Sequence, residues 1–70
     1  MMNHARKTEL MKQYPNGTRI RLVFMDDKFA PPVGTLGTVT GVDDMCSLQV
    51  SWDTGSTLSV LDQIDRVEKL

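Results

Sequence analysis

Alternating polar and apolar residues on both sides of one tight turn constrain the fold of this chain more than any other feature. The turn is Asp53-Thr54-Gly55, and apolar residues occupy every second position around it: Leu48, Val50 and Trp52 before it, Leu58 and Val60 after it. A period of two places one face of a strand in a core and the other in water. Because glycine accepts the positive φ of a tight turn, the segment predicts a β-hairpin.

Two more strands are predicted ahead of this hairpin. Residues 18–24 alternate in the same way, and three of their side chains are expected to face inward: Ile20, Leu22 and Phe24. In the second strand Val39 and Val42 are three positions apart, so simple alternation cannot place both in the core. Gly41 lies between them and predicts a β-bulge that bends the strand and restores both valines to the inner face.

The two ends of the chain add a helix and a last strand. Residues 3–13 are mostly good helix formers, and Asn3 can cap the helix. Residues 61–64 predict a single helical turn, and residues 66–70 a short strand with Val67 inward. The helix is too short to be stable alone, so we expect it to pack on the sheet.

These elements in order predict an all-β fold, a small five-stranded SH3-like barrel with a short N-terminal α-helix. A long loop at 26–36 joins the first two strands, and Pro31-Pro32 keeps its backbone out of the sheet. We therefore divide the chain into an N-terminal helix or arm, residues 1–14, and an SH3-like barrel, residues 15–70. Loops of this length in a small domain often have a function.

Size and composition narrow the function classes. The chain has 70 residues, a net charge of −1 and one cysteine, so no internal disulfide and no zinc site is expected. A core of this size rarely contributes more than about 3–5 kcal/mol, which makes a homodimer an alternative. No apolar run approaches the roughly 20 residues that span a bilayer. The polar N-terminus predicts no signal peptide, and the unpaired cysteine favours the cytoplasm.

Several motifs resemble a known family in order and spacing. They are YPNGTRIRL (14–22), MDD (25–27), APP (30–32), GTVTGVDD (37–44) and VSWDTGSTL (50–58). The chain resembles, over about residues 8–70, a family of small bacterial and phage-borne proteins described as a domain of unknown function. The resemblance implies an SH3-like barrel and an association with mobile elements, without an assigned activity. Two segments depart from the pattern: Met45-Cys46, where a glycine is expected, and residues 61–65, which lack a Pro-Gly.

Two acidic pairs suggest a binding surface. Asp26-Asp27 opens the long loop, and Asp43-Asp44 lies in the turn after the second strand. In an SH3-like barrel these loops flank one groove, which would then prefer a cationic partner. The leading hypothesis is a non-catalytic module that binds protein there, and its contact residues are Asp26, Asp27, Phe29, Asp43 and Asp44. The alternative is that these aspartates cap their own turns.

A second hypothesis places weak nucleic-acid binding on an outward basic strip made of Arg19, Arg21 and Arg66. No aromatic residue is interleaved for base stacking, and outward strand residues are polar in any case, so a solvated face is the alternative. A third hypothesis is a structural protein whose function is self-association, because a marginal core and an exposed strand edge both favour dimers.

Nothing in the sequence predicts catalysis, a metal site or a cofactor. His4 has no carboxylate or nucleophile at helical spacing. Cys46 has no histidine nearby in sequence, and an inert, partly exposed thiol is expected there. Trp52 shares a face with Leu48 and Val50, so it is predicted in the core and not in a groove for proline-rich peptides.

Overall fold

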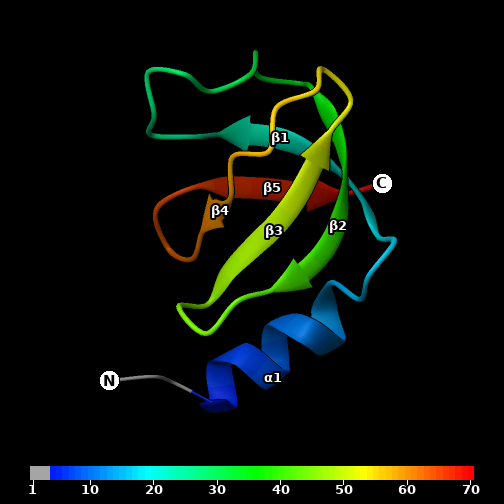
Figure 1. Ribbon diagram of the computed structural model, residues 1–70, viewed down its shortest axis with the longest axis vertical. Coiled ribbons are helices and arrows are strands. Elements are labelled where there is room, and N and C mark those ends of the chain that lie inside the picture. The colour runs from blue at the N-terminus through cyan, green and yellow to red at the C-terminus, as the bar shows by residue number, and fades with distance from the viewer. Residues whose placement is uncertain (1–3) are drawn as a thin grey trace.

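The computed structural model describes residues 4–70, in which one helix precedes five strands (Figure 1). The elements are α1 (His4–Gln13), β1 (Arg19–Phe24), β2 (Leu36–Val42), β3 (Ser47–Trp52), β4 (Val60–Leu61) and β5 (Arg66–Lys69). The predicted helix cap, Asn3, lies outside the described residues. No helix in the described part of the chain is long and apolar enough to cross a membrane.

The five strands form one antiparallel sheet in the order β4-β3-β2-β1-β5. This confirms a mostly β fold with one short helix, in which the last strand pairs with the first. The expectation of a closed barrel is wrong, because β4 and β5 are the two edges and no ladder joins them in the described chain. The predicted strand after the hairpin shrinks to Val60–Leu61, since the carbonyl of Leu58 accepts the indole N–H of Trp52 at 2.9 Å.

A buried carboxylate bridges the opening between the two edge strands. The side chain of Asp65 accepts the backbone N–H of Asp26 with one oxygen and that of Leu61 with the other, both at 2.9 Å. Asp65 is only 8% exposed, and its own N–H donates to the carbonyl of Leu61. One side chain therefore ties the start of the long loop to the end of β4, where a ladder would join strands in a closed barrel.

Register shifts decide which apolar residues reach the core. The predicted bulge is confirmed, because the pairing of β2 with β3 shifts between Val39 and Gly41. A second shift, between Leu22 and Phe24 in the pairing of β1 with β5, was not predicted. It turns Phe24 outward, where it is 48% exposed, and Met25 is buried instead. The inward position predicted for Phe24 is therefore wrong.

Trp52 organises the centre of the sheet. It is 2% exposed and lies opposite Gly37 in the β2–β3 ladder. A Cβ atom on Gly37 would lie 2.7 Å from Cε3 of Trp52 and 2.8 Å from Cγ1 of Val50. Both distances are too short for real Cβ contacts, so only glycine leaves room for the indole ring here. The predicted core position of Trp52 is confirmed.

We predict that Gly37→Ala lowers the free energy of unfolding by about 1–3 kcal/mol, because the added methyl group overpacks the core against Trp52. The matched control is Gly41→Ala, whose Cβ would meet nothing closer than an atom 3.9 Å away and which should be nearly neutral. Urea unfolding of both variants measures the difference. Equal stability of the two variants would contradict the steric role of Gly37.

Both segments that depart from the family pattern contain a residue with a left-handed backbone. Cys46 has a φ of 62° and Gln63 a φ of 67°, and the other described positive-φ residues are glycines. A non-glycine residue in this region costs roughly 1–2 kcal/mol. Cys46 is also buried, so the expectation of a partly exposed thiol is wrong. Burial of its side chain in the core offsets some of the backbone cost.

Gln63→Gly is expected to raise the free energy of unfolding by up to about 1 kcal/mol, because relief of the left-handed strain exceeds the extra backbone entropy of glycine. Gln63 is exposed, so little packing is lost. Gln63→Ala is the control that removes the side chain and keeps the strain. Thermal unfolding should rank the glycine variant above wild type, and the reverse order would show that the turn is unstrained.

Candidate functional site

The helix α1 is held to the sheet mainly by polar contacts. Among its described residues Leu10 is the buried one. Arg6 donates to both carboxylate oxygens of Asp62 at 2.8 and 2.7 Å, and Lys7 pairs with Asp44 at 2.5 Å. At the other end of the helix, the ammonium of Lys69 donates to the carbonyl of Gln13 at 2.9 Å. The helix therefore packs on its own sheet, fixed at both ends by charged side chains.

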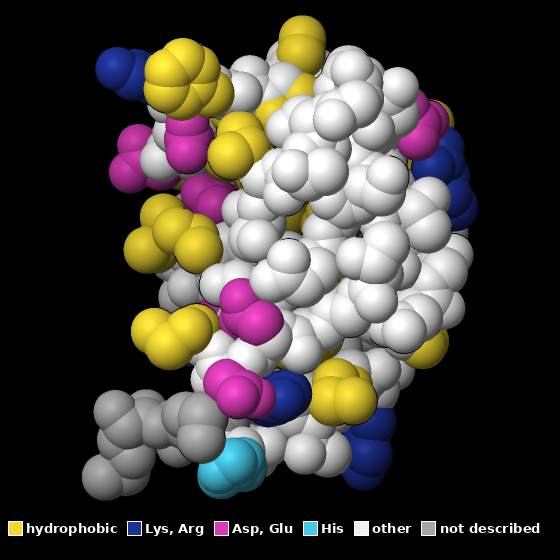
Figure 2. All heavy atoms as spheres, in the orientation of Figure 1, with side chains coloured by type: hydrophobic (Ala, Val, Ile, Leu, Met, Phe, Trp, Pro, Cys, Tyr) yellow, Lys and Arg dark blue, Asp and Glu magenta, His cyan; other side chains and the backbone are white. Residues whose placement is uncertain are grey.

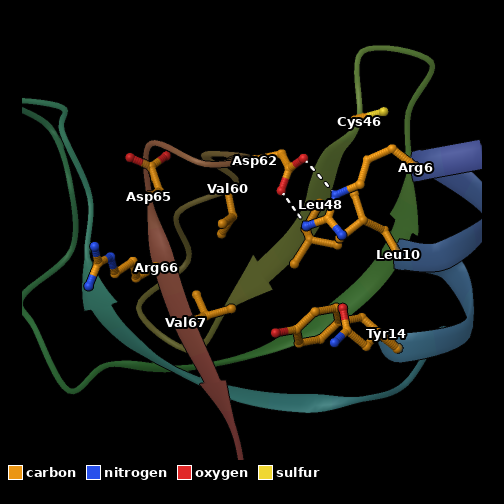
Figure 3. Close-up of a pocket in the computed structure, with 11 residues that line it drawn as sticks. Arg6, Leu10, Tyr14, Cys46, Leu48, Val60, Asp62, Asp65, Arg66 and Val67 are labelled. Atoms are coloured by element: carbon orange, nitrogen blue, oxygen red, sulfur yellow. Dashed lines mark hydrogen bonds and ion pairs between the residues drawn. The ribbon is translucent and has the colours of Figure 1, made fainter. Parts of the chain in front are cut away.

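A pocket of about 250 Å³ lies between α1 and the open edge of the sheet (Figure 3). Its lining residues come from α1 and the residue after it, from β3 and the turn before it, and from the segment 60–67: Arg6, Leu10, Gln13, Tyr14, Cys46, Leu48, Val60, Asp62, Asp65, Arg66 and Val67. Figure 3 shows Val60 and Val67 on one side of it, Leu10 on the other, and the Arg6–Asp62 ion pair crossing above. The pocket occupies the place where the sheet fails to close.

Three charged side chains that line the pocket, those of Arg6, Asp62 and Asp65, have hydrogen-bond partners within the protein. The hydrogen bonds from Arg6 hold the pKa of Asp62 below its usual value, and the same contact raises the pKa of Arg6. Arg6 also pairs with Glu9, one helical turn away. The Asp65 carboxylate is occupied by two backbone N–H groups. These lining charges stabilise the frame of the pocket.

The four predicted acidic residues do not converge. Asp26 and Asp27 lie on the long loop that leads into β2, whereas Asp43 and Asp44 follow its last residue. A seven-residue strand spans roughly 23 Å, and Figure 1 places the two loops at opposite ends of β2. No cluster of acidic, histidine or cysteine side chains that could hold a metal ion occurs within residues 4–70.

Asp43 caps its own turn. Its carboxylate accepts the backbone N–H of Met45 at 3.0 Å and of Ser47 at 2.9 Å, and the amide of Gln49 at 2.8 Å. Asp44 pairs with Lys7, and this hydrogen bond lowers the pKa of Asp44. Asp43 therefore caps its own turn, as the alternative interpretation of the sequence expected. Asp44 instead helps to hold α1 through its ion pair with Lys7.

Asp26, Asp27 and Phe29 lie together at the start of the long loop. Asp27 accepts the backbone N–H of Phe29 at 2.7 Å, and the ring of Phe29 is 73% exposed. The ammonium of Lys28 lies 5.1 Å from the centre of that ring. No described basic side chain forms an ion pair with Asp26 or Asp27. Of the residues predicted to bind protein, these three remain available on one loop.

The arginines of the predicted basic strip are mostly paired. Arg19 forms two hydrogen bonds with the carboxylate of Asp53, at 2.9 and 2.7 Å, and the contact raises the pKa of Arg19. Arg21 pairs with Glu68 at 2.8 Å across the β1–β5 ladder. Arg66 lies opposite Phe24 in the same ladder. Carboxylates therefore neutralise the positive charge of Arg19 and Arg21 on the surface where the basic strip was predicted.

Sequence reasoning missed the site between α1 and the sheet. Arg6 and Asp62 are 56 positions apart, and no spacing rule connects them. In the sequence Asp65 is only the last residue of a short connector, although in the structure it is a buried charged side chain that joins two segments. The sequence does show a basic helix and acidic turns. This charge pattern indicates that the helix packs near the turns, but it does not identify which residues form ion pairs.

We expect the contact between α1 and the sheet to weaken in acid. Arg6 and Lys7 lower the pKa values of Asp62 and Asp44, so their stabilisation is complete above the ordinary pKa of about 4 and is lost as the pH falls toward the lowered values. The methyl resonances of Leu10, followed by NMR from pH 7 to pH 2, should report the loss.

Asp62→Asn should remove most of that response. The control is Asp53→Asn, because Arg19 also lowers the pKa of Asp53 but this ion pair is with β1 and not with α1. A helix whose contacts with the sheet persist unchanged to pH 2 would show that packing of Leu10 alone holds it.

A family model described as a domain of unknown function (DUF4314) matches residues 3–70, which is nearly the whole chain. No curated protein and no solved structure matches. The match confirms the family resemblance at the level of a domain of unknown function, and the description names no activity, ligand or partner.

Proposed function

The chain belongs to this family of domains of unknown function, and we propose that it is a non-catalytic module that binds protein through the long loop between β1 and β2. The observation that carries the proposal is the composition of the exposed loop surface. Within the described residues, Asp26 and Asp27 form no ion pair and lie near Phe29, which is 73% exposed, whereas Asp44, Asp53 and Asp62 are engaged in ion pairs.

The loop is held near both of its ends by hydrogen bonds to other parts of the protein. Asp65 holds the N–H of Asp26, and the carbonyl of Leu22 accepts the N–H of Gly34 at 2.8 Å. The N–H of Leu22 in turn donates to the carbonyl of Thr35 at 2.9 Å. A loop that is fixed before binding loses little conformational entropy when a partner docks. This order supports a binding role and distinguishes the loop from a passive connection.

The side chains exposed on the long loop indicate which kind of partner would bind there. Figure 2 shows hydrophobic and acidic side chains close together along the edge where Figure 1 places the long loop and the turn from β4 to β5. Phe29 and Val33 are each 73% exposed on this loop. A cationic segment that also carries apolar side chains complements both features. Phosphate groups would be repelled by the two aspartates, which favours protein over nucleic acid.

The proposal also includes three expectations from the sequence: the SH3-like architecture, the cellular location and the phage or mobile-element setting. An antiparallel sheet of five strands is compatible with the SH3-like architecture that the resemblance implies, with the opening between β4 and β5 as a departure from closure. A cytoplasmic location and a phage or mobile-element setting also remain proposals. No observation favours self-association over binding to another protein.

An NMR titration with a peptide of alternating lysine and leucine tests the proposal. Saturable shifts are expected for the backbone amides of residues 26–34, and the amides of residues 43–47 should stay unchanged because their aspartates are already engaged. Phe29→Ala should weaken the affinity by about tenfold, as expected for an aromatic anchor. Asp26→Asn combined with Asp27→Asn should weaken it by about two- to tenfold, as expected for exposed charges.

Asp53→Asn is the matched control, since it removes an exposed carboxylate that lies outside the loop and is paired with Arg19. Its affinity should equal that of wild type. The proposal fails if a peptide of alternating glutamate and leucine produces the same shifts, or if the lysine peptide leaves residues 26–34 unmoved.

A further inference from the structure

The strand β5 is one edge of the sheet, and part of its backbone has no partner in the described chain. The N–H of Leu70 donates to the carbonyl of Arg19 at 3.2 Å, and Glu68 lies two positions before Leu70. Hydrogen-bonded and non-bonded positions alternate along an antiparallel ladder, so Glu68 and Leu70 turn their N–H and C=O groups toward β1. The same groups of Val67 and Lys69 therefore point out of the sheet.

The hydrogen bonds of β1 on its other side support this direction. The N–H of Leu22 donates to the carbonyl of Thr35, and the carbonyl of Leu22 accepts the N–H of Gly34, both just before β2. The backbone groups of Leu22 are thus directed away from Val67, its neighbour in the β1–β5 ladder. Within residues 4–70, no side chain forms a hydrogen bond with the backbone of Val67 or Lys69 in their place.

This stretch of β5 is accessible and carries positive charge that no carboxylate neutralises. Arg66 and Lys69 are exposed and Val67 is half-buried. Arg66 and Val67 also line the pocket, so open space adjoins them. Glu68 is already paired with Arg21, whereas Arg66 takes part in none of the ion pairs of the described chain. The ammonium of Lys69 contacts an uncharged carbonyl group.

Free N–H and C=O groups at every second residue match the repeat of an extended peptide backbone. A strand that is added to such an edge gains its affinity from main-chain hydrogen bonds and its specificity from alternate side chains. Residues directly opposite each other share one face of the sheet. The residue opposite Val67 would therefore meet the apolar side chains that share the pocket wall with Val67, and the residue opposite Arg66 would meet its positive charge.

We propose that β5 binds an extended segment of a partner protein, which is added to the sheet as an antiparallel strand. The segment exchanges backbone hydrogen bonds with Val67 and Lys69, and it carries an apolar residue opposite Val67 and an acidic residue opposite Arg66. This surface is separate from the long loop and selects the opposite charge. The proposal therefore does not depend on the function proposed for that loop.

Amide hydrogen exchange of the full chain, followed by NMR, tests the proposal. The probe is the acetylated and amidated peptide valine-threonine-valine-glutamate-valine. In the free protein the amides of Val67 and Lys69 should exchange at least tenfold faster than that of Glu68, because only Glu68 donates to β1. Saturating peptide should slow exchange at Val67 and Lys69 by at least tenfold, and by a larger factor than at Glu68.

Two modified peptides separate backbone pairing from side-chain contact. Methylation of the backbone nitrogens of the first two valines removes the N–H groups that face β5 and should weaken binding at least tenfold. Methylation of the threonine and glutamate nitrogens, which face away from β5, is the matched control and should leave the affinity unchanged within about threefold.

A reversal of charge tests the acidic position. Arg66→Glu should weaken the peptide by about two- to tenfold, and a peptide with lysine in place of glutamate should recover the loss, as expected for an exposed ion pair. The control is Lys12→Glu, because Lys12 is exposed on α1 and does not line the pocket beside β5. The unfolding temperature shows that each variant keeps its fold.

Several results would overturn the proposal. One is the absence of added protection at Val67 and Lys69 with saturating peptide, and another is equal binding of the two methylated peptides. Slow exchange at Val67 and Lys69 in the free protein would show that the edge is already paired. If that protection rises with protein concentration, the occupant is a second copy of this chain and not a partner protein.

Discussion

The packing of Trp52 against Gly37 determines how the rest of the sheet is arranged. The missing side chain of Gly37 admits the indole ring, and the two residues face each other in the β2–β3 ladder. The indole N–H then takes the carbonyl of Leu58, which draws the chain after the hairpin out of strand geometry. Because β4 is reduced to two residues, the sheet stays open beside β5, and the pocket beneath α1 lies at that opening.

Charge in this small domain mainly holds its parts together. The basic side chains of α1 meet acidic turns, and the outward arginines of β1 meet Asp53 and Glu68. A helix of ten residues with one buried side chain is too short to be stable alone, so these contacts have a structural role. Within the described residues, Asp26 and Asp27 at the start of the long loop take part in none of these ion pairs, which is why we propose that loop as the binding surface.

The strands could be predicted from the sequence because period-two alternation is local. It placed Ile20, Leu48 and Trp52 correctly, and the spacing of Val39 and Val42 revealed the bulge. Phe24 was misplaced because the second bulge depends on the partner strand β5, which no local pattern describes. The site was missed for the same reason: the Arg6–Asp62 pair and the Asp65 bridge join distant segments, and only the folded chain brings them together.

The carboxylate of Asp65 connects two segments of the molecule. One oxygen holds the first residues of the long loop, and the other holds the last residue of β4, next to Val60 in the wall of the pocket. A change in the position of this carboxylate would therefore affect the start of the long loop and the end of β4 together.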